Sequence, residues 1–198
     1  MNPQQAAFRA RWLSELDDAA RTLDAVRSSL TLIDEMAEVL AAALHSGGTI
    51  YTCGNGGSAL EAEHFAAELV GHFGRKRGPL RCIALPAGAG LMTALANDYD
   101  FRFVFSRQLE GFGTPRDVLL AFSTSGTSPN IVEAVRAARS LGMRTIALTG
   151  GNGGLMPSLA DLVLVLPQAN TQRAQEAHLV LVHLLAGYLD EALDAEPA

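Results

Sequence analysis

The stretch Thr49-Ile-Tyr-Thr-Cys-Gly-Asn-Gly-Gly-Ser58 joins a short apolar run to a glycine-rich turn. The run contains β-branched and aromatic residues, which favour a buried strand. The twelve residues after Ser58 are rich in alanine and leucine and predict a helix. A strand, a glycine turn and a helix in this order are typical of one unit of a parallel α/β sheet.

The same pattern recurs along the chain. Longer helical segments, rich in alanine and leucine, separate most of the short apolar runs. This alternation predicts an α/β fold in which a five-stranded parallel sheet lies between two layers of helices, a three-layer αβα sandwich. The five predicted strands are Thr49–Cys53, Cys82–Leu85, Val118–Phe122, Thr145–Leu148 and Leu162–Leu166, and a final apolar helix runs from about Gln172 to Leu193.

The length of the chain predicts one domain. Its 198 residues, 48% of them hydrophobic and 18% charged, suffice for one packed core and are too few for two ordinary ones. We expect a single domain over residues 1–198, with an N-terminal helical extension over 1–45 and the αβα core over 46–193. The extension contains one long or two shorter helices. The sequence leaves open whether it packs on its own domain or on a partner subunit.

The charge of the chain argues against nucleic acid as a partner. The formal net charge is −6, and of the 15 basic residues only Lys76 is a lysine. The one basic cluster, Arg75-Lys76-Arg77, is too small for a nucleic-acid surface.

No membrane or secretion signal is recognisable. The longest apolar stretch, Leu179–Leu189, is interrupted by His183 and is too short to span a bilayer, and the N-terminus has no apolar core with a cleavage pattern. Cys53 and Cys82 fall in predicted buried strands, where cysteine acts as a small hydrophobic residue. We therefore expect a cytoplasmic protein with reduced cysteines and no membrane partner.

Two loops at strand ends are candidates for ligand binding, because ligands of open parallel sheets bind beyond the carboxyl ends of the strands. One is the glycine loop 54–58. The other, Ser123-Thr-Ser-Gly-Thr-Ser-Pro129, has five hydroxyl residues in six positions. Gly126 allows a tight turn and Pro129 suits a first helical position. Such a loop binds phosphate through hydroxyl and backbone N–H groups. The alternative is a hydrogen-bonded turn with Ser128 as a helix cap.

Polar side chains also share one face of the helix after the first loop. Glu61, His64 and Glu68 have i, i+3, i+7 spacing, and imidazole with carboxylate can bind zinc or transfer protons. The alternative is a solvated polar face in which Glu61 forms a capping box with Ser58.

His183 lies on a mostly apolar stripe of the last helix, where it is either a core or a site histidine. Gln175 precedes it by about 12 Å of helix axis, so both reach one metal ion only if their side chains lean together. The other histidines, His45, His72 and His178, have no partner signal and are expected to be surface or packing residues.

Together these motifs resemble the sugar isomerase (SIS) domain family and, within it, the phosphoheptose isomerases. The resemblance covers about residues 35–193 and keeps the motifs in order. The motifs are Cys53-Gly-Asn-Gly-Gly-Ser58, His64-Phe-Ala-Ala-Glu68, Ala96-Asn-Asp-Tyr99, Ser123-Thr-Ser-Gly126 with Ser128, Leu148-Thr-Gly150, and Gln175-Glu176 with His183.

The resemblance implies an enzyme that interconverts sedoheptulose 7-phosphate and D-glycero-D-manno-heptose 7-phosphate through an enediol, as a homotetramer with active sites at subunit interfaces. It implies Glu68 as base, His183 as acid, and one zinc ion per subunit at His64, Glu68, Gln175 and His183. It further implies phosphate binding by Ser123, Thr124, Ser125 and Ser128, and other substrate contacts from Asn55, Gly56, Gly57, Ser58, Glu68, Asn97, Asp98 and Gln175.

Two alternatives to this function stay open. One is a non-enzymatic SIS protein that binds the replication initiator DnaA or senses a sugar phosphate. The enzyme is favoured over it by the joint presence of His64, Glu68, Gln175 and His183. The other is an isomerase of a different phosphosugar, suggested by Pro86-Ala-Gly-Ala-Gly90 where relatives carry hydroxyl or acidic residues.

Overall fold

The computed structural model describes residues 2–167 and 170–193. Five strands form one parallel sheet in the order β2-β1-β3-β4-β5. The bounds of each differ by at most two residues from the predicted run, so the predicted five-stranded parallel sheet is confirmed. The strands are β1 (Ile50–Cys53), β2 (Cys82–Ala84), β3 (Val118–Ser123), β4 (Arg144–Gly150) and β5 (Leu162–Leu166).

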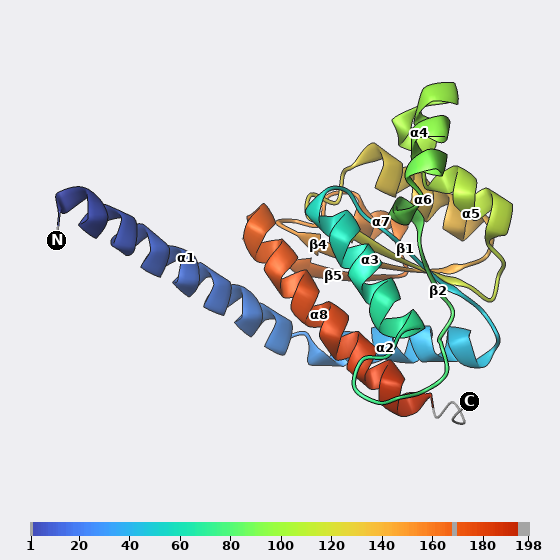
Figure 1. Cartoon of the computed structure of the whole chain (residues 1–198), viewed down its shortest axis with the longest axis horizontal. Helices are drawn as coiled ribbons and strands as arrows, with labels where there is room; N and C mark the ends of the chain where they lie inside the picture. The colour runs from blue at the N-terminus through green and yellow to red at the C-terminus, as the bar shows by residue number, and fades with distance from the viewer. Residues whose placement is uncertain (1, 168–169, 194–198) are drawn as a thin grey trace.

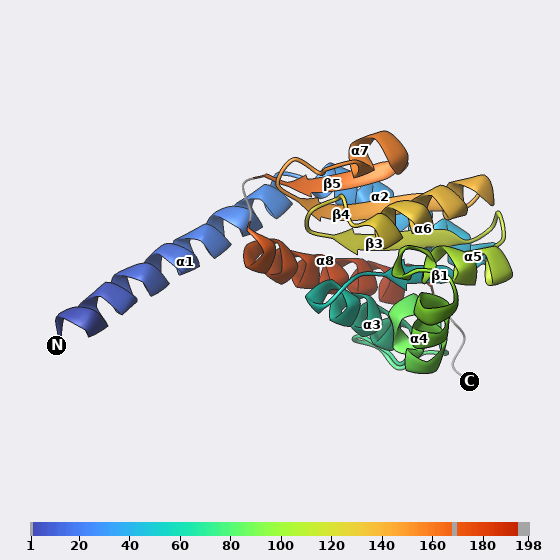
Figure 2. The same cartoon turned by 90° about the horizontal axis from the view of Figure 1, so that it is seen from above.

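Helices cover both faces of the sheet, as the predicted sandwich requires (Figure 1, Figure 2). One face packs against α2 (Leu30–His45), α3 (Gly57–Val70) and α8 (Thr171–Ala192). The other packs against α4 (Ala89–Asp98), α5 (Ser106–Phe112), α6 (Pro129–Ser140) and α7 (Met156–Leu159). Short 3-10 turns, η1 (Leu85–Ala87) and η2 (Phe101–Phe103), flank α4.

The two cores explain why the strands are apolar without alternation. In β3, Leu120 and Phe122 enter the core under α2, α3 and α8, and Leu119 and Ala121 enter the core under α5 and α6. Successive side chains of a strand point to opposite faces, and both faces are covered here. A strand buried on both faces is a continuous apolar run, which is the pattern that the sequence shows.

The N-terminal helical segment consists of two helices with different surroundings. In α2, Ile33, Met36 and Leu40 are buried in the core of the sheet. In contrast, α1 (Pro3–Arg27) buries only Thr22 and Val26, near its end, and its first turns extend away from the other elements (Figure 1, Figure 2). Thus α2 packs on its own domain, whereas α1 exposes large apolar side chains: Phe8, Trp12, Leu13, Leu16 and Leu23.

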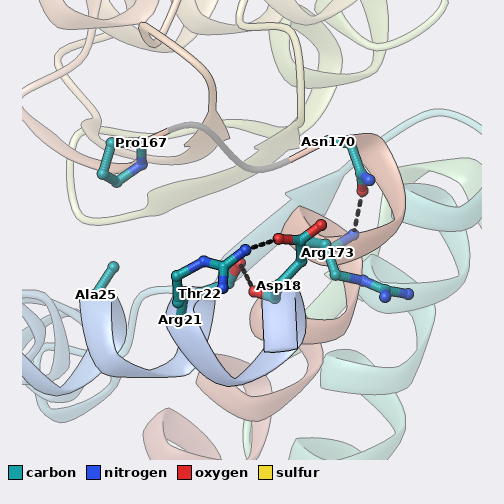
Figure 3. Close-up of a pocket in the computed structure, with 7 residues that line it drawn as sticks. All are labelled: Asp18, Arg21, Thr22, Ala25, Pro167, Asn170 and Arg173. Carbon is teal, nitrogen blue, oxygen red and sulfur yellow. Dashed lines mark hydrogen bonds and ion pairs between the residues drawn. The ribbon is translucent and has the colours of Figure 1, made fainter. Parts of the chain in front are cut away.

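A cavity of about 330 Å³ lies between α1 and the start of α8. Its polar groups mostly pair with one another (Figure 3): the Thr22 hydroxyl donates to the Asp18 carbonyl at 2.9 Å, and Asn170 Oδ1 accepts from the Arg173 N–H at 2.9 Å. The Arg173 guanidinium also donates to the Glu15 carbonyl at 2.8 Å, which joins the two helices. The lining residues include none of the predicted site residues; they are Asp18, Arg21, Thr22, Ala25, Pro167, Asn170 and Arg173.

No helix of the described residues combines the length and the hydropathy needed to cross a membrane.

Candidate active site

The glycine loop after β1 brings the start of α3 close to α8. Gly56 has a φ of +56°, a conformation that favours glycine. A Cβ atom on Gly57 would lie 2.4 Å from Gln175 Nε2, and one on Gly54 would lie 2.2 Å from the Ser58 carbonyl oxygen. Larger residues at 54 and 57 would therefore separate the two helices or distort the turn.

The hydroxyl-rich loop after β3 forms a second tight turn beside the first. Gly126 has a φ of +64°, and a Cβ atom there would lie 2.0 Å from the Gly153 carbonyl oxygen. The Gly126 N–H donates to Ser123 Oγ at 3.2 Å. Ser128 is the N-cap residue of α6 and Pro129 its first residue, but the Ser128 hydroxyl makes no capping hydrogen bond. The tight turn and the helix start are as predicted, and the alternative of a Ser128 side-chain cap is wrong.

These loops and the start of α8 enclose a cavity of about 300 Å³ in which three helix N-termini meet, those of α3, α6 and α8. N-terminal backbone N–H groups carry a partial positive charge and bind anions. All of the lining residues are uncharged, so an anion would be held by hydroxyl and N–H groups. Eight of them are predicted substrate-binding residues: the lining is Asn55, Gly56, Gly57, Ser58, Phe122, Ser123, Thr124, Ser128, Thr171 and Gln175.

Further along α3 and α8, the predicted metal and acid/base residues come together. His64 Nε2 lies 2.9 Å from Glu68 Oε1 and 3.2 Å from His183 Nε2. One ligand atom of each residue lies within 4.8 Å of the others. Two imidazole nitrogens and a carboxylate oxygen are the donor set of many zinc sites. Because the side chains of His64 and Glu68 are 40% and 24% exposed, a substrate can reach the cluster.

Glu61 does not belong to this cluster. The helix begins at Gly57, so Ser58 lies inside it, and no side-chain cap is formed. Glu61 is buried instead, with Oε2 at 3.5 Å from Nδ1 of His178. The alternative of a capping box is therefore wrong. His178 is a packing residue, fully buried with its ring edge-on to that of Phe122.

Comparison with known proteins agrees with this geometry. A family model of the SIS domain matches residues 16–150. This chain belongs to the SIS domain family. It is 47% identical over 180 residues to the phosphoheptose isomerase of Aromatoleum aromaticum, and the matched region covers 89% of this chain and 91% of that protein. Among solved structures, phosphoheptose isomerase GmhA from Neisseria gonorrhoeae matches with a TM-score of 0.87 and 37% identity, over 93% of this chain and 99% of that chain.

A phosphoheptose isomerase from Francisella tularensis matches the SIS fold equally well, with a TM-score of 0.87, 34% identity and coverage of 95% of this chain and 98% of that one. All three relatives carry the name of phosphoheptose isomerases, and this chain is similar to each of them over most of its length.

Four predicted substrate residues of this SIS domain do not line the cavity. One is Glu68, which belongs to the His/Glu/His cluster, and the other three lie on α4 and in the hydroxyl-rich turn. Asn97 and Asp98 end α4, a helix with no buried residue, and the Asn97 amide donates to Asp98 Oδ1 at 2.9 Å. Ser125 Oγ accepts from the Thr127 N–H at 3.2 Å on the exposed side of its turn. A single chain thus assembles most of the predicted substrate residues but leaves out those of α4.

Two residues absent from the sequence-based site support it. Arg77, the last residue of the basic run 75–77, has a buried side chain, and its Nε donates to Asp190 Oδ1 on α8 at 2.6 Å. Its guanidinium also donates to the backbone carbonyl of Glu68 at 3.1 Å. This network ties the end of α3 to α8, and because Arg77 and Asp190 are 113 residues apart in the chain, no local signal reveals it.

Asp190 also accepts the backbone N–H groups of Gly74 at 3.0 Å and Arg75 at 2.7 Å. Burial by itself would raise the pKa of this carboxyl, but the hydrogen bonds from Arg75, Gly74 and Arg77 and the charge of Arg77 outweigh it. The pKa of Asp190 is therefore below its ordinary value, and the ionised form is the one that holds the loop.

Proposed function

We propose that this protein is a phosphoheptose isomerase that interconverts sedoheptulose 7-phosphate and D-glycero-D-manno-heptose 7-phosphate. The observation that carries the proposal is one arrangement on α3 and α8: an anion-binding cavity at their N-terminal ends and a His/Glu/His cluster further along. About 10 Å of helix axis separates Gly57 from His64, a distance comparable to the length of an extended sugar phosphate. The names of the close relatives support the heptose as substrate.

The phosphate group would bind in the cavity. Ser123, Thr124 and Ser128 line it, together with the N-termini of three helices, and Ser125 belongs to the same turn. Because the lining is neutral, the desolvated phosphate charge is balanced by oriented N–H and O–H dipoles. Asn55, Gly56, Gly57, Ser58 and Gln175 would contact the adjoining part of the substrate.

Proton transfer would be carried out by Glu68 and His183. In an aldose–ketose isomerisation, a base removes the proton from the carbon next to the carbonyl group and an acid protonates the carbonyl oxygen, giving an enediol. The Glu68 carboxylate would take the carbon-bound proton and the His183 imidazole would protonate the oxygen. Glu68 would then give its proton to the neighbouring carbon while His183 takes the proton from the hydroxyl group of the other carbon, so that the new carbonyl group forms there and both residues regain their starting protonation states. His64, 2.9 Å from Glu68, holds the carboxylate in place.

The cluster also fits a zinc ion. His64, Glu68 and His183 supply converging donor atoms. Gln175, which lines the cavity and lies about two turns before His183 on α8, would lean towards them as the fourth ligand. When bound, zinc supplies Lewis-acid polarisation of the substrate carbonyl group.

Assembly as a homotetramer with interfacial active sites accounts for the two parts of the chain that a monomer leaves unused. The apolar side chains of α1 are exposed, and Asn97 and Asp98 stand on the exposed helix α4. A neighbouring subunit would cover the apolar side chains of α1, and Asn97 and Asp98 would enter the active site of a neighbouring subunit. We further propose one SIS domain over residues 1–198 and a cytoplasmic location, supported by two buried free cysteines, Cys53 and Cys82.

The test is a panel of phosphosugars incubated with the zinc-loaded full chain in D₂O and followed by NMR. We expect exchange of a C1 proton of sedoheptulose 7-phosphate for deuterium and the appearance of the aldose, which takes up deuterium at C2. Exchange only in a different sugar phosphate would show an isomerase of another substrate. Binding of a sugar phosphate without any exchange would contradict the enzyme and support a sensor.

A further inference from the structure

Asn55, in the glycine loop, and Asn130, in the first turn of α6, form a reciprocal amide pair. Asn55 Nδ2 donates to Asn130 Oδ1 at 2.9 Å, and Asn130 Nδ2 donates to Asn55 Oδ1 at 2.7 Å. Asn130 is 2% exposed and does not line the cavity, whereas Asn55 does. The pair therefore links a residue of the proposed substrate site to a buried residue behind it.

The pair by itself does not fix which way the amides face, because flipping both would preserve the two hydrogen bonds. A third contact removes this ambiguity. The backbone N–H of Ile131 donates to Asn130 Oδ1 at 3.1 Å. If the Asn130 amide were flipped, its NH₂ group would face this N–H, so that two donors would meet without an acceptor. The backbone of α6 thus selects the orientation of Asn130, and Asn130 selects that of Asn55.

The orientation of Asn55 then fixes which of its hydrogen-bonding groups remain for a ligand. A carboxamide has two N–H donors and two acceptor lone pairs, and the pair uses one of each. One N–H and one lone pair are left for a ligand in the cavity, in fixed positions. An amide that was free to flip would present the wrong group to a substrate hydroxyl for part of the time.

We propose that Asn130 is a positioning residue that holds the Asn55 amide in the orientation required by the sugar part of the substrate. The inference deepens the proposed isomerase function and rests on it. Asn130 touches no substrate; it acts through Asn55.

A double-mutant cycle tests this. Asn130→Leu keeps a similar volume but removes the amide, and the Ile131 N–H retains the Ser128 carbonyl as an acceptor at 3.1 Å. We expect Asn130→Leu to lower kcat/KM for the heptose phosphate about tenfold to a hundredfold, the range for loss of a buried hydrogen-bonding partner. In an Asn55→Ala background, the same substitution should have almost no further effect. Inhibition by inorganic phosphate should be unchanged in Asn130→Leu.

Two results of the cycle would overturn the proposal. If the effects of Asn55→Ala and Asn130→Leu multiply, Asn130 acts independently of Asn55. If inhibition by inorganic phosphate weakens as much as kcat/KM falls, Asn130 acts on the phosphate loop instead.

A measurement on the unmodified protein separates this inference from the proposed function and does not depend on how the variants fold. In protein labelled with ¹⁵N-asparagine, one side-chain N–H of Asn55 and one of Asn130 should exchange slowly with D₂O. Fast exchange of both Asn55 side-chain protons would refute the amide pair even in an active enzyme. Absence of turnover with slow exchange would refute the isomerase and leave the pair in place.

Discussion

His64 and His183 are 119 residues apart in the chain, and their Nε2 atoms lie 3.2 Å apart. Each imidazole comes from a different helix, and both face the same point as Glu68 Oε1. The ring of His183 also packs beside that of Phe73, with 5.6 Å between centroids. Two imidazole nitrogens and a carboxylate oxygen that converge in this way can hold a metal ion, and this geometry leads to the first prediction.

The first prediction concerns metal binding. The full chain should bind about one zinc ion per subunit, and removing a ligand with His64→Ala or His183→Ala should weaken zinc binding at least about tenfold. Metal content after dialysis and the zinc-dependent rise of Tm are the measurements. His45→Ala, on α2, is the matched control and should bind zinc normally. Normal zinc content in both site variants would contradict the proposed ligands.

The second prediction concerns the base. Glu68→Gln removes the proton acceptor while keeping the shape of the side chain, so kcat should fall by about a hundredfold to ten-thousandfold. Binding of sedoheptulose 7-phosphate, measured by calorimetry, should persist because the phosphate cavity is untouched. Glu63→Gln, on the same helix, serves as the control. Near-normal kcat in Glu68→Gln would rule out Glu68 as the base.

The third prediction concerns the buried pair of Arg77 and Asp190. Asp190→Asn leaves the buried Arg77 charge unpaired and should lower the free energy of unfolding by about 3–5 kcal/mol, measured by urea denaturation at pH 7. Arg77 and Asp190 could change kcat only by shifting the helix ends that they join. We therefore expect the loss in the free energy of unfolding to be larger than the rise in activation free energy calculated from kcat of the folded protein.

The same pair predicts a pH dependence. The pKa of Asp190 is lower in the folded state than in the unfolded chain, where it is about 3.9. Its contribution to stability is therefore complete above that unfolded value and is lost as pH falls through the lower folded pKa. Below about pH 4 the difference in free energy of unfolding between the wild type and Asp190→Asn should shrink. An advantage that does not change between pH 7 and pH 3 would show that ionised Asp190 is not what stabilises the loop.

The fourth prediction concerns the cysteines. Burial raises the pKa of both Cys53 and Cys82 well above the ordinary thiol value, so almost no thiolate forms and reagents cannot reach it. In the folded protein at pH 8 neither thiol should react with a chromogenic disulfide, and both should react in denaturant. Prompt reaction of one thiol in the folded protein would contradict the buried strands β1 and β2.

The fifth prediction concerns assembly. Trp12, the single tryptophan of the chain, is 61% exposed in one subunit. If α1 packs on partner subunits, Trp12 is buried in the assembly, and the tryptophan fluorescence of the native protein should be blue-shifted. Leu13→Glu with Leu16→Glu should shift the emission to the red and lower the mass found by light scattering, because buried charges oppose association. Gln4→Glu is the charge control. A monomeric mass for the wild type would exclude the tetramer.

The strands and loops were predictable because their signals are local. A strand buried on both faces is apolar at every position, as β3 is, and glycine or hydroxyl residues after a strand mark a tight turn before a helix. Two local alternatives were wrong, the side-chain cap of Ser128 and the capping box of Ser58 with Glu61. In the second case a tertiary contact prevailed, because Glu61 packs against His178 in the interior.

The sequence by itself therefore determined the αβα class, the five strands and the two loops at their carboxyl ends, since these follow from the preferences of neighbouring residues. The family resemblance implied that His64 and His183 meet, and the tertiary structure gave their distance. Only the tertiary structure decided the strand order, the amide pair of Asn55 and Asn130, and the burial of Arg77 on Asp190. These contacts join residues 75 to 119 positions apart. They depend on how helices pack across the sheet, which no local pattern encodes.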